Sequence, residues 1–387
     1  MRKLKEVTLL RSAKLSTLGF MVILALAALR AYQYPAYNSD EFQYMANAVA
    51  MHGAHPPEIH DTVYGEARAH IPRNILDHLL GKDPVETAQS RSYQERAANP
   101  YRFAQFLPCF AVRPLFNETV YVLHYWLGVG LLRATVFIPV FSYWIMGALL
   151  WAWISRYVVA PWAAVVSLLL MLTPPIWDLA RWPLPDGLSC LILLLALYLI
   201  LEQNRIVLGM TVLLASVYVR TDNMLLVLTV LGYLSVLNHT IEKPKAAVLA
   251  AVAVGSVFLI NHFAGDYGAK LLYYRAFVST PMAPGELVPQ VGWHDYLRGF
   301  RAGMVGIVHG NFIVFGLMGL LGWLKRPSRA ISGLAIVTVV YSVVRFLIFP
   351  LADERYFALF FVATGILLAS VAMTPPESAL GPASASS

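Results

Sequence analysis

The chain has 387 residues, of which 58% are hydrophobic and only 13% are charged, and its mean hydropathy is +0.61. A water-soluble domain could not expose such a surface without aggregating, so the composition excludes a soluble protein and indicates an integral membrane protein. The formal charge of +7 would suit nucleic acid in a soluble protein. In a membrane protein, however, Lys and Arg mainly report which loops face the cytoplasm, and we expect no nucleic-acid partner.

Long apolar runs recur along most of the chain and predict an all-α polytopic membrane protein. Each run has about 17 to 25 apolar residues, enough for a helix to cross a hydrocarbon core of about 30 Å. The first run follows a basic start, as in a signal peptide, but the many later runs favour an uncleaved signal anchor. The ten predicted spans are residues 16–34, 132–155, 160–178, 187–202, 206–220, 223–238, 246–264, 304–324, 330–350 and 357–373.

Basic residues gather in one set of alternate loops, which the positive-inside rule makes cytoplasmic. They are Arg2, Lys3, Lys5, Arg11, Lys14, Arg156, Arg205, Lys243, Lys245, Lys325, Arg326 and Arg329. Both termini are then cytoplasmic, and two long loops, 35–131 and 265–303, face the periplasm of what we expect to be a bacterial inner membrane. We expect a single transmembrane domain over 1–373 and a disordered tail over 374–387, which is rich in small residues.

The first long loop carries patterns of its own. Apolar residues recur at helical spacing in "DEFQYMANAVAMHG", and "RNILDHLLG" is similar, so both are predicted to be helices lying along the membrane surface. The apolar stretch "YRFAQFLPCFAVRPLF" is broken by Pro108 and Pro114, which indicates an interfacial or re-entrant segment. Five histidines could form a metal site, but the absence of a tight ligand motif favours scattered surface residues. They are His52, His55, His60, His70 and His78.

Two acids, Asp40 and Glu41, follow the first span by a few residues. The segment "NSDE" predicts a helix start, with Asn38 or Ser39 as N-cap and the acids complementing the free amides of the first turn. A carboxylate held at a membrane surface is also well placed to act as a general base, because burial can tune its pKa. Both roles stay open on the sequence alone.

Arginine and aspartate recur together at the outer ends of later spans. "ARWPLPDG" holds Arg181 and Asp186, and "VYVRTDN" holds Arg220 and Asp222. A turn with a capping Asp and a snorkelling Arg would explain each pair alone. Their repetition on one side of the membrane favours a shared role.

Four further cations lie on the same predicted side. Arg345 lies inside an apolar run, where an arginine is costly enough to suggest a function, and Arg355 precedes the last span. Lys270 and Arg275 lie in "AKLLYYRAFVSTP", where interfacial anchoring is the simpler interpretation. Together, these cations and carboxylates above apolar helices suit a lipid phosphate, with cations at the headgroup and an apolar groove for the tail.

This arrangement resembles the membrane-embedded C-type (GT-C) glycosyltransferases, which include protein O-mannosyltransferases and aminoarabinose transferases. Members typically have an acidic pair just after the first span, then surface helices and a bundle of spans. The resemblance covers most of the chain, and its strength lies in the order of short motifs. They are "NSDEFQYMANA", "NPYRFAQFLP", "LLRATVFIPVFSYWIMGALLWAWISRYV", "RWPLPDGLSCLILLLALYLI", "VRTDNMLLVL" and "ERYFALFFVATGILLA".

The resemblance implies a hexosyl- or pentosyltransferase of glycan biosynthesis in the cell envelope, with a polyprenyl-phosphate sugar as donor and a glycan, lipid or protein hydroxyl as acceptor. Asp40 matches the catalytic acid, with Glu41 as its neighbour, and Arg355 and Tyr356 match a pair close to the donor phosphate. Looser motifs assign Arg220 to the same phosphate and Arg181, Asp186 and Asp222 to the substrates. Lys270 and Arg275 are further candidates for cations that stabilise the departing phosphate. A divalent metal takes part of the cationic role in some relatives, and metal dependence stays open here.

Two other classes compete with this interpretation. A transporter or flippase of a lipid-linked sugar would also place polar residues against an apolar bundle, but the sequence has no evident pair of broken spans in its two halves. A glycan polymerase or ligase shares the lipid-phosphate substrate but usually carries its main outer loop nearer the C-terminus. The chain lacks the Trp-Trp-Asp signature of oligosaccharyltransferases, which argues against transfer of a whole glycan to asparagine.

Overall fold

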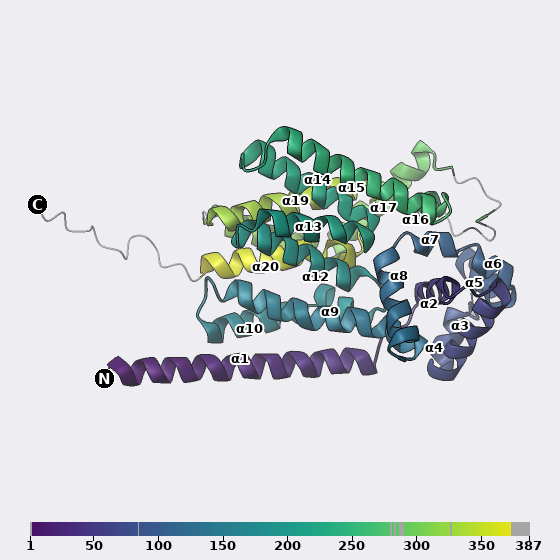
Figure 1. Cartoon of the computed structure of the whole chain (residues 1–387), viewed down its shortest axis with the longest axis horizontal. Coiled ribbons are helices and arrows are strands. Elements are labelled where there is room, and N and C mark those ends of the chain that lie inside the picture. The colour runs from purple at the N-terminus through teal and green to yellow at the C-terminus, as the bar shows by residue number, and fades with distance from the viewer. Residues whose placement is uncertain are drawn as a thin grey trace, which may run out of the picture.

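The computed structural model describes residues 2–83, 85–278, 281, 284–285, 290–325 and 327–372. Within these ranges all regular secondary structure is helical and there is no strand, which confirms the predicted all-α class. The helices form two parts that lie end to end: a bundle of long helices and, at one end of it, a compact group of short ones (Figure 1). The predicted tail, 374–387, lies outside the described residues.

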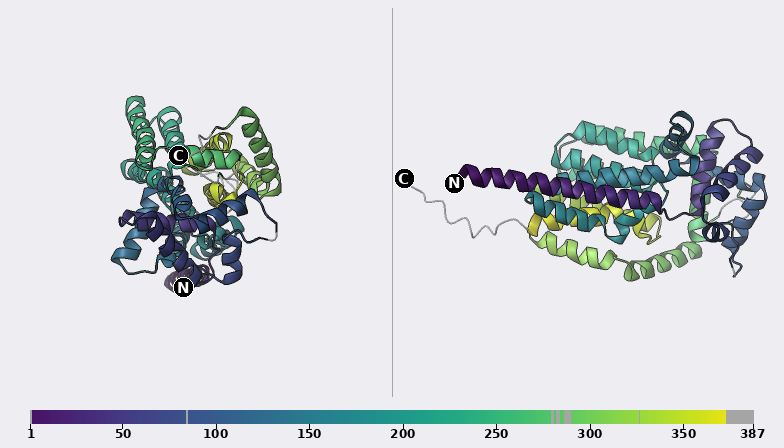
Figure 2. Two further views of the ribbon diagram at one scale, coloured as in Figure 1. Left: turned by 90° about the vertical axis from the view of Figure 1, so that its right-hand side faces the viewer. Right: turned by 90° about the horizontal axis from the view of Figure 1, so that it is seen from below.

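The first helix, α1 (Arg2–Gln33), lies along one side of the bundle and packs against α9 and α10 (Figures 1 and 2). One narrow stripe, with Phe20, Leu24 and Ala28 at helical spacing, is buried against these neighbours, whereas apolar residues such as Leu26 on the other faces are exposed. The contact with α9 is close, because a Cβ at Gly147 would overlap the side chain of Leu24. A helix exposed in this way requires an apolar surrounding such as lipid.

The short helices form a compact unit that we call the headpiece, residues 39–126. Its helices are α2 (Ser39–Met51), α3 (Pro56–His70), α4 (Arg73–Leu79), α5 (Ala88–Ala98), α6 (Pro100–Ala104), α7 (Leu107–Ala111), α8 (Pro114–Tyr121) and η1 (Val122–Trp126). The predicted helices at 40–53 and 73–81 correspond to α2 and α4, and the segment broken by prolines forms α6, α7 and the start of α8.

The predicted surface location of α2 is wrong. Its residues from Glu41 to Val49 are all buried, because α3, α7, α8 and α9 cover it on every side. The aromatic ring of Tyr44 packs edge-on against Phe110 and Phe116. α2 is therefore the central helix of the headpiece core rather than a helix with one face in the membrane.

The bundle contains the remaining helices. They are α9 (Leu131–Ile154), α10 (Ala160–Met171), α11 (Pro174–Arg181), α12 (Asp186–Leu197), η2 (Tyr198–Glu202), α13 (Ile206–Ala215), η3 (Ser216–Tyr218), η4 (Thr221–Asn223), α14 (Met224–Gly232), η5 (Tyr233–Leu237), α15 (Lys243–Phe263), α16 (Gly268–Phe277), α17 (Trp293–His309), α18 (Phe312–Leu324), α19 (Arg329–Ile348), η6 (Glu354–Phe357) and α20 (Ala358–Ala372). α1 begins and α20 ends at the same end of the bundle, away from the headpiece (Figure 1).

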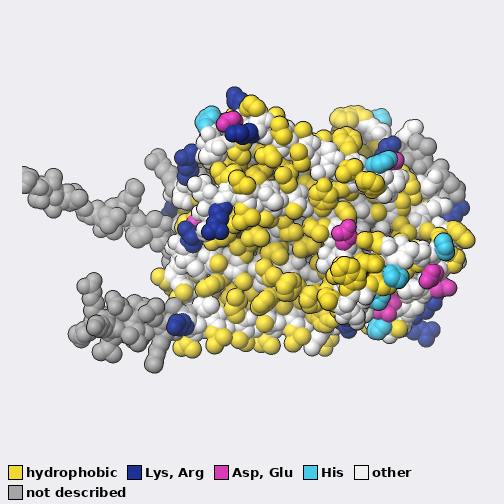
Figure 3. Space-filling view, in the orientation of Figure 1, with side chains coloured by type: hydrophobic (Ala, Val, Ile, Leu, Met, Phe, Trp, Pro, Cys, Tyr) yellow, Lys and Arg dark blue, Asp and Glu magenta, His cyan; other side chains and the backbone are white. Residues whose placement is uncertain are grey.

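Five described helices are long and apolar enough to cross a membrane: α1 from Lys14, α9, α15, α19 and η6 with α20. The number rises to seven if two bent helix pairs each count as one span. Hydrophobic side chains cover the visible face of the bundle, whereas charged and histidine side chains gather at its two ends (Figure 3). The protein is therefore a helical membrane protein, and the count of ten spans stays a prediction.

Two predicted spans differ from the observed helices. The segment predicted as 160–178 consists of α10 and α11, bent by 69° where Thr173 precedes two prolines. The segment predicted as 304–324 is shared by α17 and α18, bent by 67° at Gly310 and Asn311. α17 begins well inside the predicted loop 265–303, which also contains α16. The breaks follow local chemistry, since proline and glycine both interrupt helical hydrogen bonding.

Candidate active site

Asp40 lies in the first turn of α2, at the boundary between the headpiece and the bundle. Asn38 caps the helix, as predicted, because its Oδ1 accepts hydrogen bonds from the backbone N–H of Asp40 at 2.9 Å and of Glu41 at 3.2 Å. The Asp40 side chain is 32% exposed, and its Oδ1 lies 3.6 Å from Nη2 of Arg275 on α16. Asp40 is therefore a carboxylate that a substrate could reach, held next to a cation.

Glu41 faces a different environment from its neighbour. It is fully buried, and its Oε1 accepts a hydrogen bond of 2.7 Å from the hydroxyl of Thr135 on α9, while Oε2 has no partner. Burial raises the pKa of Glu41 to about 8, although the Thr135 hydroxyl acts in the opposite direction. Glu41 is thus a protonated acid near neutral pH that joins α2 to α9, away from any surface that a substrate could reach.

Asp40 and three arginines near it form what we call the junction cluster: Asp40, Arg96, Arg113 and Arg275. Arg96 on α5 is 3% exposed, and its guanidinium lies over the rings of Tyr93 and Phe106, with centroids at 4.6 and 4.5 Å. Arg113 and Arg275 both lie over the ring of Phe110.

Members of the junction cluster also influence one another electrostatically. Asp40 lies close enough to Arg96 and to the buried thiol of Cys109 to interact with both. Burial lowers the pKa of Arg96, and the neighbouring Arg275 lowers it further. The cluster therefore concentrates positive charge around a single carboxylate.

A second group of charges, the bundle cluster, consists of Asp186, Arg220, Asp222 and Arg345. Arg220 donates to both carboxylate oxygens of Asp222 at 3.0 Å and also to Asp186. Arg345 donates from Nε and Nη2 to Oδ2 of Asp222, at 3.2 and 3.0 Å. Each arginine here has a carboxylate partner, and each carboxylate has an arginine, as buried charges require.

Arg355 and Tyr356 connect the two clusters. The Tyr356 ring lies beneath three guanidinium groups, those of Arg220, Arg345 and Arg355, with centroids 4.5 to 4.8 Å away. Arg355 also donates to the Tyr356 hydroxyl at 3.1 Å and pairs with Asp353 at 2.8 Å. Both Asp186 and Asp40 are close enough to Arg355 to interact with it electrostatically. The two clusters therefore belong to one polar region.

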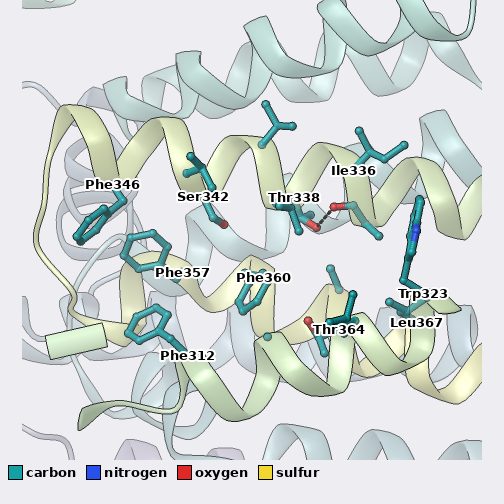
Figure 4. Close-up of a pocket in the computed structure, with 18 of the residues that line it drawn as sticks. Phe312, Trp323, Ile336, Thr338, Ser342, Phe346, Phe357, Phe360, Thr364 and Leu367 are labelled. Atoms are coloured by element: carbon teal, nitrogen blue, oxygen red, sulfur yellow. Dashed lines mark hydrogen bonds between the residues drawn. The ribbon is translucent and has the colours of Figure 1, made fainter. Parts of the chain in front are cut away.

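Two cavities adjoin this region. A polar cavity of about 190 Å³ lies between α11 and η6, with Asp178, Trp182, Asp186, Asp353 and Arg355 among its lining residues. A larger apolar cavity of about 650 Å³ lies among α18, α19 and α20 (Figure 4).

The apolar cavity leads towards the bundle cluster. Phe312, Phe346 and Phe357 lie together at one end of it, and Trp323 lies at the other (Figure 4). The guanidinium of Arg345 lies 5.2 Å from the Phe357 ring centroid. The phenylalanine end of the cavity is therefore adjacent to charged residues, whereas the rest of its lining is mostly apolar, with the hydroxyl groups of Thr338, Ser342 and Thr364 among it.

Most of the predicted site residues come together, but Glu41, Lys270 and Arg181 do not. Asp40 and Arg275 meet in the junction cluster, whereas the bundle cluster and its immediate surroundings hold Asp186, Arg220, Asp222, Arg355 and Tyr356. Lys270 is exposed on α16. Arg181 is 40% exposed and lies 3.7 Å from Asp178, outside both clusters.

Sequence reasoning missed Arg96, Arg113 and Trp182. A usable signal existed for Arg113, because it interrupts the apolar run "FLPCFAVRPLF", where an isolated cation needs an explanation. Arg96 lies in the polar sequence "SYQERAANP", where nothing distinguishes it from a surface residue. Trp182 lies within the motif "ARWPLPDG", of which only the Arg and the Asp were considered.

In the part of the chain that the structure describes, no group of three or more His, Cys, Asp or Glu side chains is arranged to hold a metal ion. Four of the five predicted surface histidines are exposed: His52, His55, His70 and His78. His60 differs, since it is buried and hydrogen-bonds the carbonyl of Ala97 at 3.0 Å.

Comparisons with models of protein families, with curated proteins and with solved structures find no match to this chain. The chemistry of the site therefore rests on the residues described above and on their geometry.

Proposed function

We propose that the protein is a membrane glycosyltransferase that moves a sugar from a polyprenyl-phosphate donor to a hydroxyl of a glycan, lipid or protein acceptor. The observation that carries this proposal is the position of Asp40, a partly exposed carboxylate beside an excess of arginines, in a region bordered by an apolar cavity. The order of motifs that resembles GT-C glycosyltransferases supports the same function.

Asp40 is suited to be the general base. Its carboxylate can accept the proton of an acceptor hydroxyl while the hydroxyl oxygen forms a bond to the anomeric carbon. The bond from that carbon to the phosphate oxygen breaks, and its electron pair leaves with the polyprenyl phosphate. Nearby guanidinium groups stabilise the negative charge that develops there.

The apolar cavity is suited to the polyprenyl chain. It offers a lining of aromatic and aliphatic side chains, and its phenylalanine end is adjacent to Arg345 and Tyr356. A donor with its tail in this cavity would have its phosphate in the polar region that the two clusters form. We place the headpiece on the periplasmic side of a bacterial inner membrane and both termini in the cytoplasm, from the distribution of basic residues.

Sugar transfer in membranes tests this proposal. Radiolabelled sugar transfer from a panel of polyprenyl-phosphate donors is measured for wild type, Asp40→Asn and the control Asp61→Asn, whose side chain is 86% exposed on α3. We expect Asp40→Asn to lower transfer by about 10²- to 10⁴-fold, the usual contribution of a general base. Asp61→Asn should transfer normally. Equal transfer by a well-folded Asp40→Asn protein would remove Asp40 from catalysis.

A transporter or flippase of a lipid-linked sugar is the second candidate, because the structure corrects the argument that disfavoured it. Two helix pairs, α10 with α11 and α17 with α18, are broken, and they lie in different halves of the chain. Broken helices in both halves are a common feature of transporter binding sites. The polar cavity supports this further, since α11 lines it and Glu354 in its lining binds Asn311 at the second break.

An assay in liposomes separates the two candidates. Purified protein is reconstituted with a fluorescent polyprenyl-phosphate sugar, and movement between the leaflets is followed without an acceptor. Movement by wild type and by Asp40→Asn alike, with no sugar transfer in the membrane assay, would favour the flippase. Transfer that requires Asp40, with no movement between leaflets, would favour the glycosyltransferase.

A further inference from the structure

The arginines of the junction cluster have few hydrogen-bond partners. Each guanidinium carries five N–H donors. Among the described residues, Arg96 donates from Nε to the carbonyl of Ser92 at 3.1 Å, and Arg275 donates to Sγ of Cys109 at 3.8 Å. The Arg113 side chain donates to none of them, and Nη2 of Arg96 and Nη1 of Arg113 are buried without a partner.

The charges of the junction cluster are also unbalanced. Among the described residues, Asp40 is the one carboxylate within the ion-pair distance of about 4 Å from any of its three arginines. An excess of two positive charges therefore remains in a mostly buried place, where an unpaired charge is costly. The bundle cluster differs, since its two arginines are balanced by two aspartates and each makes direct hydrogen bonds to carboxylate.

The described residues supply no second carboxylate to these guanidinium groups. A phosphate group is suited to this place because it offers several acceptor oxygens to planar N–H donors. Aromatic rings already hold the guanidinium groups in position, so little reorganisation is needed when the anion binds. The contact between Asp40 and Arg275 is longer than a hydrogen bond, so it does not occupy the donors of Arg275 fully.

We propose that Arg96, Arg113 and Arg275 form a phosphate-binding subsite, whereas the bundle cluster is a structural ion-pair network. In a glycosyltransferase the bound group would be the phosphate of the lipid donor, and this part of the inference rests on the proposed function. The assignment differs from the one that the motifs imply, because it adds Arg96 and Arg113 and removes Arg355 and Arg220 from direct phosphate binding.

The charge excess also predicts which form of the phosphate binds better. A sugar-linked polyprenyl phosphate is a diester with one negative charge, and the polyprenyl phosphate left after transfer is a monoester with about −1.5 to −2 charges at neutral pH. An excess of two positive charges matches the monoester more closely. The subsite would then stabilise charge as it develops on the leaving phosphate more than it stabilises the donor.

Ligand-dependent thermal unfolding of the full-length protein in a non-ionic detergent tests the subsite. The probes are dodecyl phosphate, methyl dodecyl phosphate, dodecanol and inorganic phosphate. We expect dodecyl phosphate to raise the unfolding temperature of wild type and to bind about tenfold or more tightly than the methyl diester, since one more charged interaction is made. Dodecanol should have no effect.

Variants locate the site. Arg96→Gln and Arg275→Gln should each weaken dodecyl phosphate binding by about tenfold or more. Arg355→Gln is the matched control, because it removes another aromatic-stacked arginine of the same polar region and should retain binding. Arg275 is 18% exposed, so Arg275→Gln keeps the test valid if Arg96→Gln does not fold.

Each outcome has a defined meaning. Binding that is lost in Arg355→Gln, or retained in both Arg96→Gln and Arg275→Gln, would overturn the subsite, as would the absence of any shift in wild type. Inorganic phosphate that binds as tightly as dodecyl phosphate would support the anion subsite and overturn its assignment to a lipid. None of these measurements requires sugar transfer, so a failed subsite and a failed glycosyltransferase proposal give different results.

Discussion

The arginines of the junction cluster and of the bundle cluster lie in similar aromatic surroundings, but the two clusters differ in how far carboxylates neutralise the positive charge. In the bundle cluster, Asp222 accepts hydrogen bonds from both Arg220 and Arg345, and Asp186 accepts another. In the junction cluster, the one carboxylate at ion-pair distance among the described residues is Asp40, which lies 3.6 Å from Arg275, and the other two arginines have none. A protein can satisfy a buried cation with its own acids, in which case the cation is committed to structure. It can also leave the cation without a carboxylate partner, in which case an anionic ligand can bind there.

Removing one arginine from each cluster should produce the largest difference in stability. Arg220→Gln leaves Asp186 without its arginine and Asp222 with Arg345 alone, and breaking a buried pair usually costs about 3–5 kcal/mol. Arg96→Gln removes a cation that has no carboxylate partner, so without ligand its effect should be much smaller or even stabilising. Denaturation of both variants in the same detergent, under phosphate-free conditions, measures the difference.

The stability losses of Arg96→Gln and Arg220→Gln are informative only when they are compared with each other. If Arg96→Gln destabilises the protein as much as Arg220→Gln, Arg96 has a structural role and the contrast between the clusters is lost. Arg220→Lys is a further control, since it keeps the charge but cannot bind a carboxylate at two points, and it should fall between wild type and Arg220→Gln.

The buried acid beside the junction cluster gives the next largest effect. The folded-state pKa of Glu41, about 8, lies above its ordinary value of 4.5, so the folded protein holds a proton that the unfolded chain releases. The contribution of this proton to the free energy of unfolding is greatest at low pH. It falls by about 1.4 kcal/mol per pH unit as the pH rises from about 5 to 8.

Glu41→Gln tests this contribution, because glutamine keeps the shape of the protonated acid and cannot ionise. As the pH rises over this range, the unfolding free energy of wild type should fall relative to that of Glu41→Gln. A constant difference from pH 5 to 8 would show that Glu41 is ionised in the folded protein, and Glu41 would again be a candidate for chemistry beside Asp40.

Local sequence signals predicted the helical class and the start of α2, because helix periodicity and capping depend on a few neighbouring residues. Asn38 as N-cap is such a case. The predicted surface position of α2 was wrong, because its apolar stripe gave no sign that Gln43 and Asn47 on its other faces would also be buried. Burial on all sides depends on α7 and α8, which fold over α2 from later in the chain.

The candidate site was predicted only in part, again because local sequence signals do not report contacts between distant parts of the chain. Arg220, Asp222 and Arg355 were found because each belongs to a short motif of charged residues. Their pairing was not predictable, since Arg345 and Asp222 are 123 residues apart. Arg96 was missed because a polar segment gives no sign that one of its arginines is 3% exposed. The helix breaks were signalled by prolines and glycine, but the 69° and 67° bends depend on packing.

A smaller effect is expected where α16 approaches the headpiece, because this contact places Arg275. A Cβ at Gly268 would overlap the carbonyl oxygen of Pro108, whereas Gly255 on α15 has open space around it. Gly268→Ala should therefore lower stability by about 1–3 kcal/mol and weaken dodecyl phosphate binding. Gly255→Ala should be neutral or slightly stabilising, since alanine favours helix more than glycine. Normal phosphate binding by Gly268→Ala would mean that Arg275 does not depend on this contact.

The smallest effect tests whether the hydroxyl of Thr135 matters to Glu41. Thr135→Val keeps the shape of the side chain but removes the 2.7 Å hydrogen bond, which should cost about 1 kcal/mol at pH 5 to 6. Thr135→Ser keeps the hydroxyl and should retain most of this contribution.

Because the hydrogen bond from Thr135 also lowers the pKa of Glu41, its loss should raise this pKa and extend the fall in stability to higher pH. In a Glu41→Gln background the pH dependence introduced by Thr135→Val should disappear, and its persistence there would assign the effect to another titrating group.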